Sequence, residues 1–323
     1  MAETTARRRF LRVALAFLCV YLVWGSTFLV IRVALRDLPP LFLCAVRLLI
    51  GGALLAGIAW RTRLPWPRGV EWRNAAVVGL LLPAIGNGSV TLAETHVPSG
   101  LVAMLVATIP MWMAWLGTLG PDGVPLTARV ITGLLVGFAG IALLVGPGHL
   151  GGARDGVVWA LLPILGSLSW GWGSLWSRRA QLPASPLVST AVGLTAGGAV
   201  LLAASGVGGE WTRLGPGALH ARPVAAVLYL AVFGSVVGFT AYLWLLRHVT
   251  PSRVSTYAFV NPVVAMALGV MVGGEPFDAR VAIASGFVIV AVALIVTAPA
   301  PARVVSTARP APDAGERRAK PAA

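Results

Sequence analysis

Successive apolar runs of roughly 20 residues follow one another along most of the chain, separated by short segments that carry proline, glycine and arginine. A helix of that length, at about 1.5 Å per residue, crosses the roughly 30 Å of hydrocarbon in a bilayer. Of the 323 residues, 57% are hydrophobic and 11% are charged, whereas about a quarter of a typical soluble domain is charged. The sequence therefore predicts an all-α membrane protein without a separate soluble domain.

Ten transmembrane helices are predicted, joined by short loops whose Pro, Gly and Asp residues mark the turns. The helices are expected near 11–34, 40–60, 73–93, 98–119, 127–147, 156–177, 184–205, 223–246, 252–273 and 278–297. The first run follows Arg7, Arg8 and Arg9, as in a secretory signal peptide, but it is too long for the apolar part of such a signal. We therefore expect it to remain as the first membrane helix.

The basic residues predict the orientation. About eighteen lysines and arginines fall on the side of the membrane that holds the N-terminus, and about six fall on the other side. Because cytoplasmic segments carry the excess of basic residues, both termini are predicted to be cytoplasmic, in a multi-pass protein of the inner or plasma membrane. This dispersal also explains the net charge of +14, so that no nucleic-acid partner is expected.

The two halves of the chain repeat one pattern, with a period of about 151 residues. The fourth and ninth runs each carry a Pro-Ser pair and a later proline, at Pro98-Ser99 with Pro110 and at Pro251-Ser252 with Pro262. The fifth and tenth runs both open with Ala-Arg-Val. Five spans per half turn the second copy upside down, which predicts two inverted five-helix repeats, an arrangement found in many secondary transporters.

The expected organisation has five parts. These are a cytoplasmic tail at 1–10, a first repeat at 11–147, a linker at 148–155, a second, inverted repeat at 156–297, and a disordered basic cytoplasmic tail at 298–323.

Several segments resemble the EamA repeat of the drug/metabolite transporter superfamily. They are Trp24–Phe28, the segment 93–110 with the sequence AETHVPSGLVAMLVATIP, Pro251–Arg253 leading to Asn261-Pro262, and Gly273-Gly274-Glu275. The resemblance covers both halves, from about residue 13 to 297, and it implies ten helices, cytoplasmic termini and export of amino acids or other small metabolites without ATP. The chain departs from the family after the fourth helix, where Pro121-Asp122-Gly123 replaces the expected Gly-Glu.

Polar residues within the runs are the first candidates for substrate binding. Asn87, Thr91 and Glu94 are spaced three to four residues apart and form one stripe, which we expect to face the protein interior. Glu94 could bind a substrate amine, carry a coupling proton, or lie at the outer mouth as an interfacial residue. Asn261 is a buried amide that needs hydrogen-bond partners.

Aromatic residues at membrane depth are the second group of candidates: Trp24, Trp112, Trp170, Tyr242 and Tyr257. They come from five predicted helices in both halves. Aromatic walls with a few polar groups suit an apolar or aromatic small molecule, and can hold an ammonium group by cation–π contact. Taken singly, each tryptophan is more often part of the core packing than a ligand contact, and the set is better evidence for a binding site.

Pro110 and Pro262 are predicted to kink their helices at equivalent depth, either to gate the pathway or merely to serve packing. Arg47 lies about 10 Å inside the second helix, and we expect it to snorkel outward or to pair with Glu94. Gly193 and Gly197 are spaced for close helix approach, within the protein or at a dimer face.

These features favour a secondary carrier that exports a small organic metabolite, such as an amino acid or an amphipathic drug-like compound, by alternating access. A passive facilitator or channel, or an uptake permease of the same fold, is the alternative. The sequence offers no carboxylate cluster, zinc motif or nucleotide-binding loop, so neither an enzyme nor an ATP-driven pump is predicted, and no cofactor or metal. The expected partners are a small-molecule substrate and the lipid bilayer, with the chain as a monomer or homodimer.

Overall fold

The computed structural model describes residues 2–119, 126–145, 154–272, 274 and 279–298, and this part of the chain is helical with no strand. Its α-helices are α1 (Ala2–Ala34), α2 (Pro40–Arg61), α3 (Val70–Gly79), α4 (Gly88–Ala93), α5 (Ser99–Val106), α6 (Ile109–Leu116), α7 (Ala128–Val145), α8 (Arg154–Arg179), α9 (Pro186–Val207), α10 (Ala221–Tyr229), α11 (Thr240–His248), α12 (Pro251–Val254), α13 (Tyr257–Met271) and α14 (Ala279–Val296). The other elements are two π-helices, η1 (Leu80–Asn87) and η4 (Leu230–Phe239), and two 3-10 turns, η2 (Glu210–Arg213) and η3 (Pro216–Leu219). Most of the predicted linker at 148–155 and of the predicted tail at 298–323 lies outside the described residues.

Seven of the described helical runs are long and apolar enough to cross a membrane. They are Phe10–Ala34, Pro40–Arg61, Val70–Ala93, Ser99–Leu116, Gly156–Arg179, Pro186–Val207 and Ala221–His248. Three shorter apolar helices cover Ala128–Gly140, Val260–Met271 and Ala282–Ile295. The all-α, multi-pass class is confirmed, while the count of ten crossings stays a prediction. The first helix begins at Ala2 and thus includes the segment predicted as a tail.

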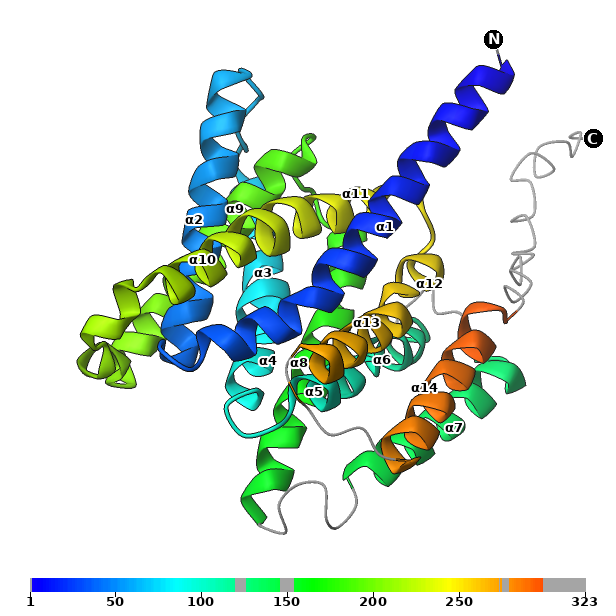
Figure 1. Ribbon diagram of the computed structural model, residues 1–323. Helices are drawn as coiled ribbons and strands as arrows, with labels where there is room; N and C mark the ends of the chain where they lie inside the picture. Colours follow the sequence, from blue (N-terminus) through cyan, green and yellow to red (C-terminus); the bar gives the residue numbers. More distant parts are fainter. Residues whose placement is uncertain (1, 120–125, 146–153, 273, 275–278, 299–323) are drawn as a thin grey trace, which may run out of the picture.

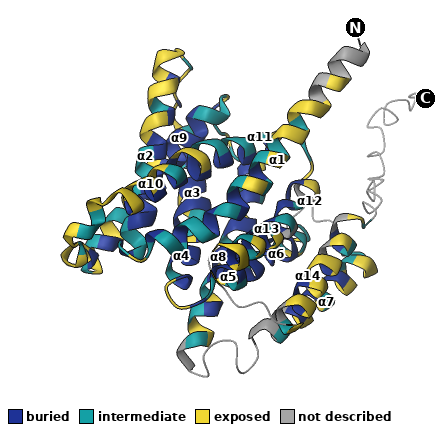
Figure 2. Ribbon diagram, viewed as in Figure 1, coloured by how far each residue is buried: buried dark blue, intermediate teal, exposed yellow. Residues whose placement is uncertain are grey.

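Figure 2 shows exposed residues along the outward faces of the helices, and many large hydrophobic side chains are among them. Leu15, Leu135 and Leu165 are each more than half exposed, at 60%, 66% and 58%. Soluble monomers rarely expose apolar patches larger than a few hundred Å². We conclude that these faces contact lipid, in agreement with the membrane class.

Helices from the two halves of the chain pack in pairs. α2 lies along α9, and α7 lies along α14 at one edge of the molecule (Figure 1). α1 contacts α13 and η4, while α8 contacts α6 and η1. The approach of α3 to α9 requires glycine, because a Cβ at Gly79 would overlap the backbone of Gly193. A Cβ at Gly197 would come within 2.5 Å of the Gly79 carbonyl oxygen, so the predicted close approach at this glycine pair is confirmed within the protein.

A carboxylate distant in sequence caps the N-terminus of α2. The chain enters this helix through Pro39 and Pro40, neither of which offers a capping side chain, so the first amides need other acceptors. Glu210 of η2 accepts hydrogen bonds from the Leu41 amide at 3.2 Å and the Phe42 amide at 2.8 Å. It is 5% exposed and also accepts from the Ser205 hydroxyl at 2.9 Å. A negative charge here also interacts favourably with the helix dipole.

The two predicted proline kinks differ in form. The fourth predicted helix is interrupted at Ala107 and Thr108, so that Pro110 falls in the first turn of α6, where a proline costs no hydrogen bond. In the second half the interruption precedes Tyr257, and Pro262 lies inside α13, which continues past it. The expectation of matching breaks at the two prolines is therefore corrected, and a gating role for them stays a prediction.

Candidate functional site

A buried pocket lies at the centre of the bundle, where the first and second halves of the chain meet. It is lined by residues of α1, α2, η1, α4, α5, α6, α8, η4 and α13, namely Trp24, Thr27, Phe28, Ile31, Arg47, Gly86, Asn87, Val90, Val106, Ile109, Pro163, Gly166, Ser167, Trp170, Gly234, Phe239, Tyr257 and Asn261. Its volume is about 50 Å³, on a scale where one water molecule needs roughly 10–15 Å³. Side chains thus nearly fill the site in this conformation.

Five packed rings lie on one side of this pocket, four of them in its lining and Tyr242 behind, and we call them the aromatic cluster: Trp24, Trp170, Phe239, Tyr242 and Tyr257. Trp24 is its centre, with ring centroids 5.2 to 5.4 Å from each of the other four. Edge-to-face contacts at such distances are the favoured geometry for aromatic pairs. The Trp24 indole also donates to the Gly234 carbonyl oxygen at 3.0 Å, which ties α1 to η4.

A second set of hydrogen bonds fixes the cluster on the side of α8. The Trp170 indole donates to the Tyr242 hydroxyl at 2.9 Å, and this hydroxyl also pairs with that of Ser174 at 2.7 Å. All three side chains are buried. Satisfied polar groups in a buried aromatic wall hold its rings in defined orientations.

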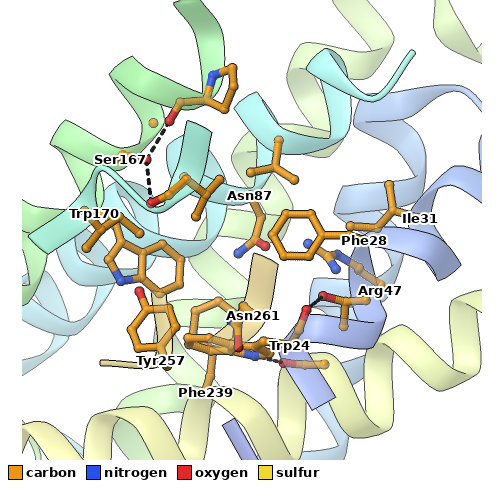
Figure 3. A pocket seen from close by; sticks show the side chains of 18 residues that line it. Trp24, Phe28, Ile31, Arg47, Asn87, Ser167, Trp170, Phe239, Tyr257 and Asn261 are labelled. Atoms are coloured by element: carbon orange, nitrogen blue, oxygen red, sulfur yellow. Dashed lines mark hydrogen bonds between the residues drawn. The ribbon is translucent and has the colours of Figure 1, made fainter. Parts of the chain in front are cut away.

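Arg47 points into the same pocket, which corrects the sequence-based expectation (Figure 3). The side chain is 2% exposed, so it does not snorkel to the surface. Its Nη2 donates to Cys44 Sγ at 3.8 Å, and Glu94 does not pair with it. The sequence did hold a signal for this residue, because a charge within an apolar run is a functional candidate by default.

The two π-helices place backbone and polar groups at the pocket. Asn87 ends η1, with its side chain directed into the pocket, and Gly234 and Phe239 belong to η4. Single π-turns within α-helices occur frequently at functional sites. Here the wider turns occupy corresponding positions in the two halves, since η1 and η4 begin 150 residues apart, at Leu80 and Leu230.

Asn261 belongs to α13 and faces α1. With its amide oriented to suit its neighbours, its Nδ2 donates to the Tyr21 carbonyl oxygen at 3.1 Å and to that of Tyr257 at 3.2 Å. Ser167 on the opposite side donates to the Pro163 carbonyl oxygen at 2.7 Å. These residues complete the rim of the pocket.

The structure brings five of the nine predicted binding residues to the pocket lining and leaves four elsewhere. The lining holds Trp24, Asn87, Trp170, Tyr257 and Asn261. Tyr242 lies behind it in the aromatic cluster. Thr91 is buried, with its hydroxyl bonded to the Asn87 carbonyl oxygen; Glu94 is 3% exposed at the end of α4; and Trp112 packs against Trp115. Among the described residues no cluster of His, Cys, Asp and Glu suited to a metal ion occurs.

Comparisons with known proteins match the chain to a family of membrane transporters. The sequence profile of the EamA-like transporter family matches residues 11–146 and again residues 157–297. The "Uncharacterized inner membrane transporter YedA" of Escherichia coli K12 is 38% identical over 281 residues, covering 87% of this chain and 89% of that protein. The "Uncharacterized transporter YvbV" of Bacillus subtilis is 26% identical over 271 residues, covering 82% and 85%. A solved crystal structure aligns with a TM-score of 0.62 at 20% identity, over 87% of this chain and 95% of that one, which shows a common fold.

Proposed function

This chain belongs to the EamA-like transporter family, and from that premise we propose that it is a secondary carrier for a small organic solute. The central pocket is its substrate site, and the solute passes by alternating access without ATP. The observation that carries the proposal is a buried aromatic pocket whose lining combines residues of both family repeats. A site at the interface of two repeats is where such carriers bind substrate.

The proposed architecture is ten membrane helices in two inverted repeats of five. The family profile matches once in each half. In the proposed repeat, α1 corresponds to α8, α13 to α6 and η4 to η1. The contacts follow this correspondence, because α1 packs on α13 and η4, and α8 packs on α6 and η1. The π-helices lie at corresponding positions as well. Rocking one repeat against the other would open the pocket first to one side and then to the other.

The pocket must widen before it can hold an organic solute, because its present volume admits only a few water molecules. A carrier that exposes its site in alternation must change conformation to do so, and the widening of the site would be part of that change. Both termini are proposed to be cytoplasmic from the arginine distribution, and outward transport is proposed from the family resemblance.

Counterflow in proteoliposomes tests the carrier function. Purified protein is reconstituted, loaded with one unlabelled compound from a panel of amino acids, aromatic acids and cationic drugs, and assayed for uptake of the same labelled compound. A carrier gives transient accumulation with at least one compound. If no compound on the panel accumulates above protein-free vesicles, the proposal fails.

Two tryptophans on α8 provide a matched pair for the site. Trp170 is 6% exposed and lines the pocket, whereas Trp172 is 57% exposed on the outer face of the same helix. We expect Trp170→Ala to abolish counterflow and Trp172→Ala to retain it. Equal activity of the two variants would contradict the assignment of the pocket.

A further inference from the structure

Among the described residues that line the pocket, Arg47 carries the one formal charge and none is acidic. The guanidinium lies about 10 Å inside α2, which begins at Pro40. Its one hydrogen bond is to the Cys44 sulfur, a weak acceptor, and its Nε has no partner. Among the described residues, none with a carboxylate pairs with it.

A buried cation without a counter-charge is costly in a membrane protein. Burying an ion costs several kcal/mol, by order of magnitude, unless an opposite charge and hydrogen bonds compensate for the loss of water. Ionisable groups at this depth therefore pair with one another or serve the transported species. Since no described residue supplies an anion at Arg47, we look to a ligand as the source.

The hydrogen-bond inventory of the pocket agrees with this reasoning. The hydroxyls of Thr27 and Ser167 already donate to backbone carbonyl oxygens, and the Asn261 amide donates to two others. By contrast, Nδ2 of Asn87 is buried and has no acceptor. Figure 3 shows the Asn87 amide and the Arg47 guanidinium both directed into the pocket. The Tyr257 hydroxyl is also without a hydrogen-bond partner, and it can donate or accept. Each of these unused groups can thus donate, which suits a ligand that presents an acceptor with negative charge.

We propose that the pocket selects an organic monoanion, with a carboxylate on Arg47 and Asn87 and an apolar or aromatic body on the aromatic cluster. This proposal deepens the carrier function and rests on it. The planar fork of arginine matches a carboxylate, with two parallel hydrogen bonds. A single cationic residue balances one negative charge and leaves a second one uncompensated. An ammonium group would instead lie beside Arg47 without any carboxylate in the lining to hold it.

A series of compounds with one carbon skeleton and different charges tests the proposal. 3-Phenylpropionate carries only the carboxylate, phenylalanine carries both groups, and 2-phenylethylamine carries only the ammonium. Phenyl phosphate adds an anion of higher charge. In counterflow with labelled 3-phenylpropionate, we expect exchange of the carboxylate, weaker competition by phenylalanine and by phenyl phosphate, and none by the amine.

Variants of Arg47 connect the selectivity to the residue. Arg47→Met keeps a long apolar side chain without charge, and we expect it to raise the half-saturation concentration for 3-phenylpropionate about thirtyfold or more. Arg47→Lys keeps the charge but loses the fork, so an intermediate value is expected. Arg61→Met, at the exposed end of the same helix, is the matched control and should leave the value unchanged. Thermal unfolding in detergent verifies that each variant is folded; if Arg47→Met is not, Arg47→Lys decides.

The outcomes separate the two proposals. If the wider panel exchanges amines or neutral compounds while 3-phenylpropionate is inert, the carrier function stands and the anion selectivity is overturned. The anion selectivity is also overturned if the folded variants of Arg47 exchange 3-phenylpropionate with the wild-type half-saturation concentration. If nothing on either panel exchanges, both proposals fail.

Discussion

Trp24 organises the aromatic cluster, and Gly238 is the residue that makes room for it. A Cβ at position 238 would overlap Nε1 of the Trp24 indole and come within 2.8 Å of its Cδ1. The same Nε1 donates to the Gly234 carbonyl oxygen. Gly238→Ala must therefore push the indole away from η4 and break that hydrogen bond. The displaced ring has the pocket on one side and four packed rings on the other.

The magnitude follows from three terms. Forcing one extra carbon into a packed core costs about 1–3 kcal/mol, and losing a buried hydrogen bond costs about 0.5–1.5 kcal/mol. Alanine recovers about 1 kcal/mol through its better helix propensity. The net loss is then about 0.5–3.5 kcal/mol, which corresponds to a fall in Tm of roughly 1–14 °C.

The assay is thermal unfolding of purified protein in detergent, followed by intrinsic tryptophan fluorescence, together with counterflow. Gly57→Ala is the control, because a Cβ at this helical position of α2 meets nothing within 4 Å. That variant should unfold at or above the wild-type temperature and transport normally. If Gly238→Ala is as stable and as active as Gly57→Ala, the indole is not held as described, and the account of the aromatic cluster is refuted.

Two further substitutions test other contacts. Glu210→Ala removes the acceptor for two α2 amides and for Ser205, and should cost about 2–4 kcal/mol in unfolding free energy. The control Glu71→Ala removes an acceptor for one loop amide and should cost less than about 1 kcal/mol. Equal effects of the two variants would contradict the capping role of Glu210. Trp170→Phe keeps a ring but loses the donor to Tyr242; we expect about 0.5–1.5 kcal/mol of destabilisation by thermal unfolding, and an unchanged Tm would show that this hydrogen bond contributes nothing.

The helices were predictable from the sequence because lipid imposes a length and an apolar composition on each of them. The aromatic residues of the site were candidates because tryptophans such as Trp24 and Trp170 lie away from the interfacial belts, although Trp172 at a similar depth is exposed. Asn261 followed from the cost of an unpaired amide. In each case the physical requirement depends on depth alone, and depth can be counted along a helix.

Rotation about the helix axis could not be counted in this way. Snorkelling of Arg47 and its direction into the pocket are both compatible with its depth, and only the packing of α2 against α9 and η4 decides between them. The same limit separates Asn87, which reaches the pocket, from Thr91, which bonds to the backbone one turn earlier. The π-helix η1 contributes to this difference, because a wider turn shifts every later residue around the axis.

Two exposed threonines can decide the orientation of the protein, and with it the side to which Arg47 is nearer. Thr62 follows α2 and Thr212 lies in η2, next to the start of α2; each donates its hydroxyl to a backbone carbonyl oxygen three or four residues earlier. With the native cysteines Cys19 and Cys44 replaced by alanine, a membrane-impermeant maleimide added to intact cells should label Thr212→Cys but not Thr62→Cys, because the arginine excess lies on the side of Thr62. The reverse pattern would overturn the predicted orientation.

That result also fixes how a bound anion would lie. Arg47 is about 10 Å from the end of α2 near Thr212, whereas Trp24 is about 15 Å from the corresponding end of α1. In the predicted orientation, the cation is therefore nearer the outer face and the aromatic cluster lies deeper. On the outward route, the carboxylate of the solute would separate from Arg47 last and then enter water directly. On the route from the cytoplasmic side, the apolar body of the solute would first pass the packed rings. Labelling of Thr62→Cys alone would exchange these two sides, and the rings would then form the outer barrier.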